Sequence, residues 1–114
     1  MRQGSEAEDS AAEYLMGLGF TLVTRRHKAR GGELDIVALD GEDLVFVEVR
    51  SRRAGMPEAS ISQVKVSRLF AAAQDYLRQA NQVGRPFRFD IITFSAEGLR
   101  HHRGAFADYA DLDA

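Results

Sequence analysis

The chain has 114 residues, of which 45% are hydrophobic, and its formal net charge is −2 at pH 7. This length suits one hydrophobic core, so we expect residues 1–114 to form a single domain with an ordered core at about 5–103 and an acidic C-terminal tail. The absence of cysteine excludes disulfides and thiolate metal sites. The longest strongly apolar run, residues 44–47, is too short to cross a membrane, and the expected location is cytoplasmic.

The first predicted element is a helix over residues 5–18. Its apolar residues recur at helical spacing, and Gly17 and Gly19 mark its end. Glu8 falls at the edge of the apolar stripe, so we expect it to face the rest of the domain, whereas the other acids of the helix point away. An acid in a first turn is also favoured by the helix dipole, and the sequence leaves both interpretations of Glu8 open.

Basic residues dominate the segment after this helix. Residues 20–23 have strand character and lead into an expected loop that ends at Gly31-Gly32. A net acidic chain does not coat nucleic acid through bulk charge, but clustered basic residues could hold phosphates locally; solvated loop charge is the alternative. The candidate nucleic-acid contacts are Arg25, Arg26, Lys28, Arg30, Arg52 and Arg53.

A β-hairpin is the clearest motif of the chain. Residues 33–39 and 44–50 flank Asp40-Gly41, a dipeptide that favours tight turns. Side chains alternate along a strand, and a turn of two or four residues places odd positions of the first strand opposite even positions of the second. One face then combines polar and apolar residues: Glu33, Asp35, Val37, Leu44, Phe46, Glu48 and Arg50. The opposite face of the first strand is uniformly apolar: Leu34, Ile36 and Ala38.

The acids on this hairpin need an explanation. Asp35 and Glu48 would lie opposite each other at roughly 5 Å between Cβ atoms, where two carboxylates repel unless a cation separates them. An ordinary solvated sheet face is the alternative, but the apolar residues of the same face place the acids at the end of a buried strip, where an unpaired carboxylate is costly. Without a metal, we expect Arg50 to reach one of the two acids.

The second half of the chain predicts one helix and two strands. Ser60 and Gln63 indicate a capping box for a helix that runs to about residue 82. Lys65 lies within the apolar arc of that helix, where a snorkelling lysine is the alternative to a site residue. A strand follows over residues 85–94, then a turn at Glu97-Gly98 and a short strand over residues 99–102.

Two pairs of polar residues in these last strands are interpreted without a catalytic role, one as a structural ion pair and the other as surface residues. Arg88 and Asp90 share a strand face and predict an ion pair. His101 and His102 project to opposite faces of their strand, make a poor metal pair and are interpreted as surface residues. The order α-β-β-β-α-β predicts a mixed α/β sheet with helices packed on it and the antiparallel hairpin at its centre.

Two motifs resemble the PD-(D/E)xK nuclease superfamily: Glu33-Leu34-Asp35 and, twelve residues later, Val47-Glu48-Val49-Arg50. The resemblance is closer to one branch, the YraN family of uncharacterised bacterial proteins, and it extends from Gly4 to Phe106. The residues that carry it are Gly4, Glu8, Ala11, Leu15, Gly32–Ile36, Val45–Arg50, Arg52, Lys65 and Arg88–Asp90.

The superfamily resemblance implies a restriction-endonuclease-like αβββαβ core and a Mg²⁺ or Mn²⁺ ion held by Asp35, Glu48 and the backbone carbonyl of Val49. Glu8 is then a supporting acid, as in Holliday-junction-resolvase-like members. Phosphodiester cleavage builds negative charge on the phosphorus oxygens, which such an ion stabilises. Further supporting positions are Glu33 and Gln63.

The superfamily pattern ends in lysine, and this chain has Arg50 instead. Arginine stays charged at any working pH and cannot accept a proton. Deprotonation of the attacking water would then fall to the metal-bound water itself, to Glu8 or to Lys65.

The sequence favours a divalent-metal-dependent endonuclease that acts on structured or branched DNA. Its catalytic candidates are Glu8, Asp35, Glu48, Arg50 and Lys65. A nucleic-acid-binding domain without catalysis is the first alternative, and Arg50 is the feature that separates the two. A protein-interaction module that kept the nuclease fold is the second, and it would show neither metal binding nor salt-dependent DNA binding. No membrane partner is expected, and the oligomeric state stays open, a homodimer included.

Overall fold

The computed structural model describes residues 3–51 and 61–106, so the predicted acidic tail, Arg52, Arg53 and Ser60 lie outside the described residues. The α/β class and the order of elements are as predicted, and the last strand is longer than expected. No helix in the described ranges is long and apolar enough to span a membrane. The elements are α1 (Gln3–Gly17), β1 (Thr21–Ala29), β2 (Gly32–Asp40), β3 (Asp43–Ser51), α2 (Gln63–Gln79), β4 (Phe87–Ser95) and β5 (Gly98–Ala105).

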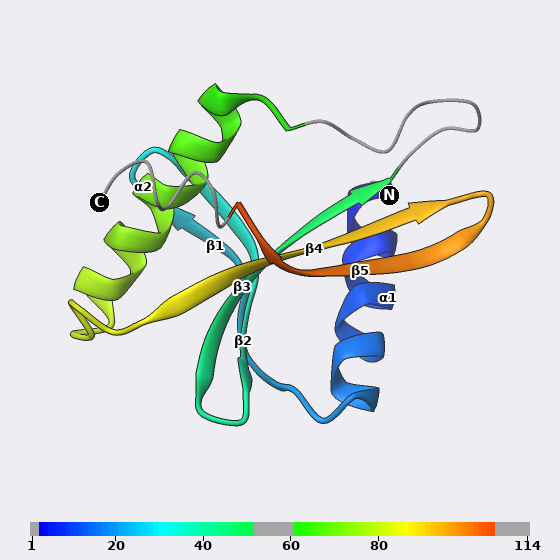
Figure 1. The fold of residues 1–114 in the computed structure, drawn as a ribbon, viewed down its shortest axis with the longest axis horizontal. Helices are drawn as coiled ribbons and strands as arrows, with labels where there is room; N and C mark the ends of the chain where they lie inside the picture. Colours follow the sequence, from blue (N-terminus) through cyan, green and yellow to red (C-terminus); the bar gives the residue numbers. More distant parts are fainter. Residues whose placement is uncertain (1–2, 52–60, 107–114) are drawn as a thin grey trace.

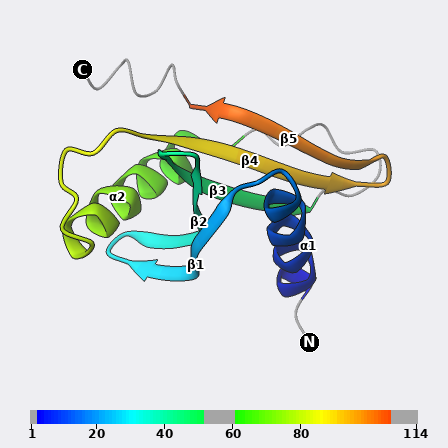
Figure 2. The same cartoon turned by 90° about the horizontal axis from the view of Figure 1, so that it is seen from below.

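The strands form one mixed sheet in the order β1-β2-β3-β4-β5. Figure 2 shows β1 and β5 at its two edges. Only β3 and β4 pair in parallel among these strands, and the other three neighbouring pairs are antiparallel. A parallel pair needs a long crossover between its strands, and α2 lies in that connection.

Both faces of the sheet are covered, each by one helix (Figure 1). Helix α1 packs its apolar stripe on one end of the strands, and α2 packs on the other face toward the opposite end. Burial on both faces explains the continuous apolar run at the start of β3. The α1 side buries Ala11, Leu15, Ile36, Ala38, Val45, Val47 and Ile92. The α2 side buries Leu34, Val37, Leu44, Phe46, Leu69, Ala72, Ala73, Leu77 and Phe89.

The predicted hairpin is formed by β2 and β3. Their ladder runs from the Asp40 and Asp43 pair to the Ile36 and Val47 pair, so odd positions of β2 face even positions of β3 as predicted. Gly41 has a φ of 64°, the left-handed conformation that tight hairpin turns require. The turn chemistry therefore sets which side chains of the two strands share a face.

The basic segment that was predicted to be a loop is an edge strand instead. Strand β1 continues to Ala29 and pairs Arg25 with Ile36 and Lys28 with Glu33. A register shift between Leu22 and Thr24, together with the positive φ of Arg26 (52°), breaks the regular alternation by which a strand is recognised. Basic side chains are a common feature of edge strands, which they protect from pairing with other chains.

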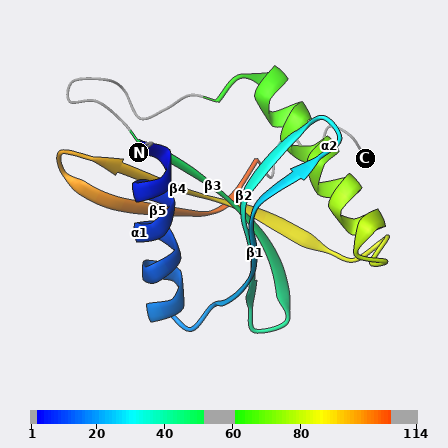
Figure 3. The same cartoon turned by 180° about the vertical axis from the view of Figure 1, so that it is seen from behind.

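The prediction that Leu34, Ile36 and Ala38 share one face of the sheet is wrong for Leu34. Ile36 and Ala38 pack beneath α1, but Leu34 joins the cluster beneath α2. Figure 3 shows the end of the β1–β2 hairpin beside α2. The irregular positions of β1 increase the local twist, which accounts for the change of side within β2.

Helix α2 begins at a different cap from the one predicted. Ser62 is the N-cap, and its hydroxyl oxygen accepts a hydrogen bond from the backbone N–H of Lys65 at 3.1 Å. The helix ends at Gln79, three residues before the predicted end. The Ser62 cap fixes the first turn of α2, and Lys65 projects from that turn.

The turn between β1 and β2 presses on α2 at Gly31, which has a φ of 94°. A Cβ atom there would lie 3.2 Å from Cβ of Ala71. We expect Gly31→Ala to lower the free energy of unfolding by about 2 kcal/mol, because it adds this close contact to the strain of a positive φ. Urea unfolding measures the change.

Gly41→Ala is the matched control, because Gly41 also has a positive φ but a Cβ atom there would meet nothing within 4 Å. It should lose only the conformational part, about 1 kcal/mol. Equal losses in the two variants would contradict a packing role for Gly31.

Candidate active site

The acid pair, Asp35 of β2 and Glu48 of β3, lies where the β2–β3 ladder ends. The register that pairs Ile36 with Val47 places these two residues opposite each other. The backbone N–H of Val49 donates to Asp35 Oδ2 at 2.8 Å. The Glu48 side chain is 7% exposed, so the pair sits at the end of the apolar strip beneath α2.

The pKa of Asp35 is raised from 3.8 to about 7. Burial is the main cause, and the charge of Glu48 and a hydrogen bond with it act in the same direction. The N–H of Val49 opposes the rise, whereas the charge of Glu8 adds to it. Two carboxylates held this closely favour a proton or a cation between them.

The cation that faces the acid pair is Lys65, not Arg50. Lys65 Nζ lies 3.6 Å from Glu48 Oε2. Within the described residues, Arg50 makes no hydrogen bond or ion pair with Asp35 or Glu48, so the predicted contact is wrong. Arg50 follows Glu48 by two residues, roughly 7 Å further along the strand, whereas the first turn of α2 holds Lys65 beside Glu48.

Glu8 of α1 points toward the sheet and is 13% exposed. Its Oε1 accepts a hydrogen bond from Arg26 Nε at 2.7 Å. This hydrogen bond and the charge of Glu8 raise the pKa of Arg26, with smaller contributions from Asp9 and Glu33. Because the charge of Glu8 also acts on Asp35, the helix acid lies near the acid pair, where its place in the apolar stripe predicts it.

The predicted nucleic-acid contacts that lie in the described residues fall into two groups. Arg25 and Arg26 pair with acids of α1: an Arg25 guanidinium nitrogen lies 2.7 Å from Asp9 Oδ1, and Arg26 binds Glu8. Lys28 and Arg30 are exposed at the end of the β1–β2 hairpin. The two groups therefore differ in how much of their charge is already balanced within the protein.

The backbone N–H of Arg30 donates to Asp75 Oδ2 at 2.9 Å and is the main cause of the lowered pKa of Asp75. Glu33 and Gln63, the predicted supporting residues, are both exposed. In the described residues neither forms a hydrogen bond or an ion pair with the acid pair.

The described ranges contain no group of three or more acidic, histidine or cysteine side chains arranged to hold a metal ion. The acid pair alone supplies two carboxylates, which are hard oxygen donors of the kind that Mg²⁺ and Mn²⁺ prefer. The raised pKa of Asp35 reflects the repulsion of Glu48 and the burial of the carboxyl group, both of which a bound cation would offset. The donor chemistry fits a divalent ion if a third ligand comes from the backbone or from water.

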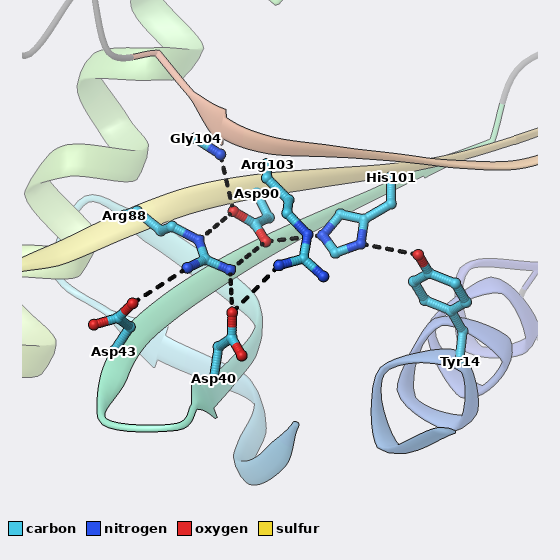
Figure 4. Close-up of polar contacts among 8 residues, drawn as sticks. All are labelled: Tyr14, Asp40, Asp43, Arg88, Asp90, His101, Arg103 and Gly104. Atoms are coloured by element: carbon cyan, nitrogen blue, oxygen red, sulfur yellow. Dashed lines mark hydrogen bonds and ion pairs between the residues drawn. The ribbon is translucent and has the colours of Figure 1, made fainter. Parts of the chain in front are cut away.

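A second polar network surrounds Asp90 on the α1 side of β4 and β5 (Figure 4). The Asp90 side chain is fully buried and accepts from Arg88 Nε at 3.0 Å and from the N–H of Gly104 at 3.1 Å. His101 Nε2 lies 2.8 Å from its other oxygen, and the Tyr14 hydroxyl lies 3.0 Å from His101 Nδ1. The predicted ion pair of Arg88 and Asp90 is confirmed.

The interpretation of His101 as a surface residue is wrong, because its side chain is only 6% exposed. His102 is exposed, as predicted. Strand alternation places His101 on the same face as Leu99, which packs against the α1-side core. This alternation was the feature of the sequence that could have predicted the burial of His101. Burial opposes ionisation of Asp90, but donation from Arg88, His101 and Gly104 outweighs it and lowers the pKa of Asp90.

The fold and the site together define a mixed α/β protein with a pair of carboxylates, one buried and one half-buried, beside a lysine. A family model described as uncharacterised protein family UPF0102 matches residues 7–94. The chain belongs to this family, which is the YraN family that the sequence motifs resemble, so the predicted family is confirmed.

Relatives of similar length share about two fifths of its residues. The UPF0102 protein of Persephonella marina is 40% identical over 114 residues, covering 97% of this chain and 95% of the relative. That of Pelotomaculum thermopropionicum is 42% identical, covering 90% and 93%. The UPF0102 protein BAV3162 of Bordetella avium is 43% identical, covering 91% of this chain and 74% of the relative.

Proposed function

We propose that this protein is a divalent-metal-dependent endonuclease of the PD-(D/E)xK superfamily that acts on structured or branched DNA. One observation carries the proposal: the pair of buried Glu48 and half-buried Asp35, with the pKa of Asp35 raised to about 7, lies beside the amine of Lys65. The order of α1, the three following strands, α2 and β4 supports a restriction-endonuclease-like core.

Asp35, Glu48 and the Val49 carbonyl would hold the ion. When bound, Mg²⁺ or Mn²⁺ supplies positive charge that stabilises the negative charge developing on the scissile phosphate. The protein contributes a pair of carboxylates kept in place by the Val49 N–H and the β2–β3 register. Glu8, itself fixed by Arg26, adds negative potential that favours a cation at this position.

Lys65 can supply the proton-exchanging amine that Arg50 does not provide at the lysine position of the superfamily pattern. An amine can exchange a proton, whereas a guanidinium stays charged. Lys65 Nζ lies 3.6 Å from Glu48 and can orient a water molecule next to the acid pair. Arg50 lies on the same strand face and can hold a phosphate by charge and by two parallel hydrogen bonds.

A cleavage assay on a labelled four-way DNA junction with Mn²⁺ or Mg²⁺ tests this function. We expect the wild type to cut, Asp35→Ala to be inactive, and Lys65→Ala to lose about 100-fold or more, because it removes a proton-exchanging group. Arg78→Ala, on the exposed side of the same helix, should cut as the wild type does.

Two outcomes would contradict the proposal. If the wild type binds the junction without cutting it and only Arg50→Lys cuts, the natural protein is a DNA-binding domain without catalysis. If the wild type neither binds nor cuts single-stranded, duplex or branched DNA with either metal, the nuclease function is wrong. Cleavage that persists in Asp35→Ala would indicate a contaminating enzyme.

A further inference from the structure

The sheet face that carries Glu48 continues across β4 and β5. Glu48 pairs with Ile91, and Ile91 pairs with His102. One step further along the same strands, Arg50 pairs with Thr93, and Thr93 pairs with Arg100. Paired residues of neighbouring strands point to the same face, so these positions form two parallel rows across three strands.

Helix α2 packs on this face over an earlier part of the strands, at Phe46 and Phe89. Beyond that contact, Ile91 and Arg50 are half-buried, and Arg100 and His102 are exposed. Thr93 is buried between Arg50 and Arg100, so its short side chain forms the floor between two long basic ones. Within the described residues, the part of this face beyond α2 therefore carries basic side chains and borders the acid pair.

We propose that the basic rows, Arg50, Arg100 and His102, bind the phosphodiester backbone of the DNA strand that enters the acid pair. This proposal rests on the proposed nuclease function and assigns the path of its substrate. Arg50 and Arg100 are two interstrand spacings apart, roughly 10 Å. Their side chains are long and flexible enough to hold neighbouring phosphates of one strand, with the scissile phosphate beside Arg50, at Glu48 on the same strand.

Charge complementarity favours a nucleic acid for this surface. Two arginines can each form bidentate contacts with phosphate oxygens, and a backbone that carries one charge per nucleotide supplies them at regular intervals. The residues predicted from the sequence to bind DNA do not include Arg100 or His102. The sheet register reveals them, because β5 pairs with β4 at the level of the site.

The test measures binding of a labelled four-way junction by fluorescence anisotropy at several salt concentrations, in EDTA and with Ca²⁺ in place of Mg²⁺. We expect Arg100→Ala to weaken binding about tenfold and to reduce the slope of log Kd against log salt by about one. Arg100→Lys keeps the charge and should retain the slope. His102→Ala should weaken binding by a smaller factor.

Arg103→Ala is the matched control. Arg103 is three residues from Arg100 on β5 but lies on the other side of the sheet, where it pairs with Asp40 at 3.4 Å and its guanidinium lies over the Phe20 ring. It should leave the affinity and the salt slope unchanged. Circular dichroism melts verify that each variant is folded.

The outcomes separate this proposal from the nuclease function. If the wild type binds and cuts but Arg100→Ala binds equally well, or Arg103→Ala loses as much, the basic rows are wrong and the function stands. If the wild type binds no DNA in either buffer, both fall. Polyglutamate that competes as well as unlabelled junction would assign the rows to an acidic protein partner instead.

Discussion

Asp90→Ala should lower the free energy of unfolding by about 3–5 kcal/mol. The Asp90 carboxylate is fully buried and accepts from Arg88, from the N–H of Gly104 and at the Nε2 side of His101. Removing it leaves Nε2 of the buried His101 and the N–H of Gly104 without their acceptor, and it takes one partner from the Arg88 guanidinium, which keeps Asp40 and Asp43. Buried polar groups that lose their hydrogen-bond partner are each destabilising, and several lose it at once here. Urea unfolding followed by circular dichroism gives the difference from the wild type.

Asp43→Ala is the control, because Asp43 also contacts Arg88, at 3.6 Å, but its side chain is 75% exposed. An exposed ion pair contributes less than about 1 kcal/mol. Similar losses in the two variants would contradict a special role for the buried network. The two variants each remove one carboxylate that contacts Arg88, so the difference between their losses of stability measures the effect of burial.

The Asp90 network also predicts an acid dependence. The pKa of Asp90 in the folded protein is lowered below 3.8, so the unfolded chain takes up the proton first as the pH falls. Its contribution to stability is complete above the unfolded pKa and is lost as the pH falls through the folded one. Between pH 5 and pH 2 the wild type should lose more stability than Asp90→Asn.

The hairpin and its acids could be predicted because their information is local. Asp40-Gly41 sets the turn, and the turn sets the parity that brings Asp35 opposite Glu48. Alternation and helical spacing likewise predicted the ion pair of Arg88 and Asp90 and the direction of Glu8. In each case the partners lie on one strand, on two strands joined by a short turn, or on one helix face.

What could not be predicted depends on contacts between distant segments. The partner of Glu48 is Lys65, whose position follows from how the first turn of α2 packs and not from its spacing along the chain. The partners of His101 are Asp90 and Tyr14, the second 87 residues away. The basic part of β1 was predicted as a loop because a register shift and the positive φ of Arg26 conceal its alternation.

Asp35→Asn should make the metal-free protein more stable than the wild type at pH 8, by on the order of 2 kcal/mol. The pKa of Asp35 is raised to about 7 by burial and by Glu48, so ionising it costs folding free energy. Asparagine removes this charge but keeps an oxygen that can accept from the Val49 N–H.

The sign of the pH dependence follows from the raised pKa. Between pH 8 and pH 4 the folded protein binds the proton more tightly than the unfolded chain does, so the wild type gains stability as the pH falls. The advantage of Asp35→Asn should therefore shrink steadily across this range. Thermal melts at pH 8, 7, 6 and 5 measure it. A variant less stable than the wild type at every pH would show that the ionised carboxylate is favourable in the fold.

The same variant should lose its response to Mn²⁺. A divalent ion that binds only the folded wild type stabilises it by about 2.7 kcal/mol when its concentration is 100 times Kd, whereas the neutral amide of Asp35→Asn is a poor ligand. Asp9→Asn is the control, since Asp9 is an exposed acid of α1 outside the acid pair, and it should respond as the wild type does. An increase in Tm with Mn²⁺ that is equal in all three proteins would place the ion elsewhere. An increase confined to the wild type and Asp9→Asn would assign it to Asp35, independently of any cleavage assay.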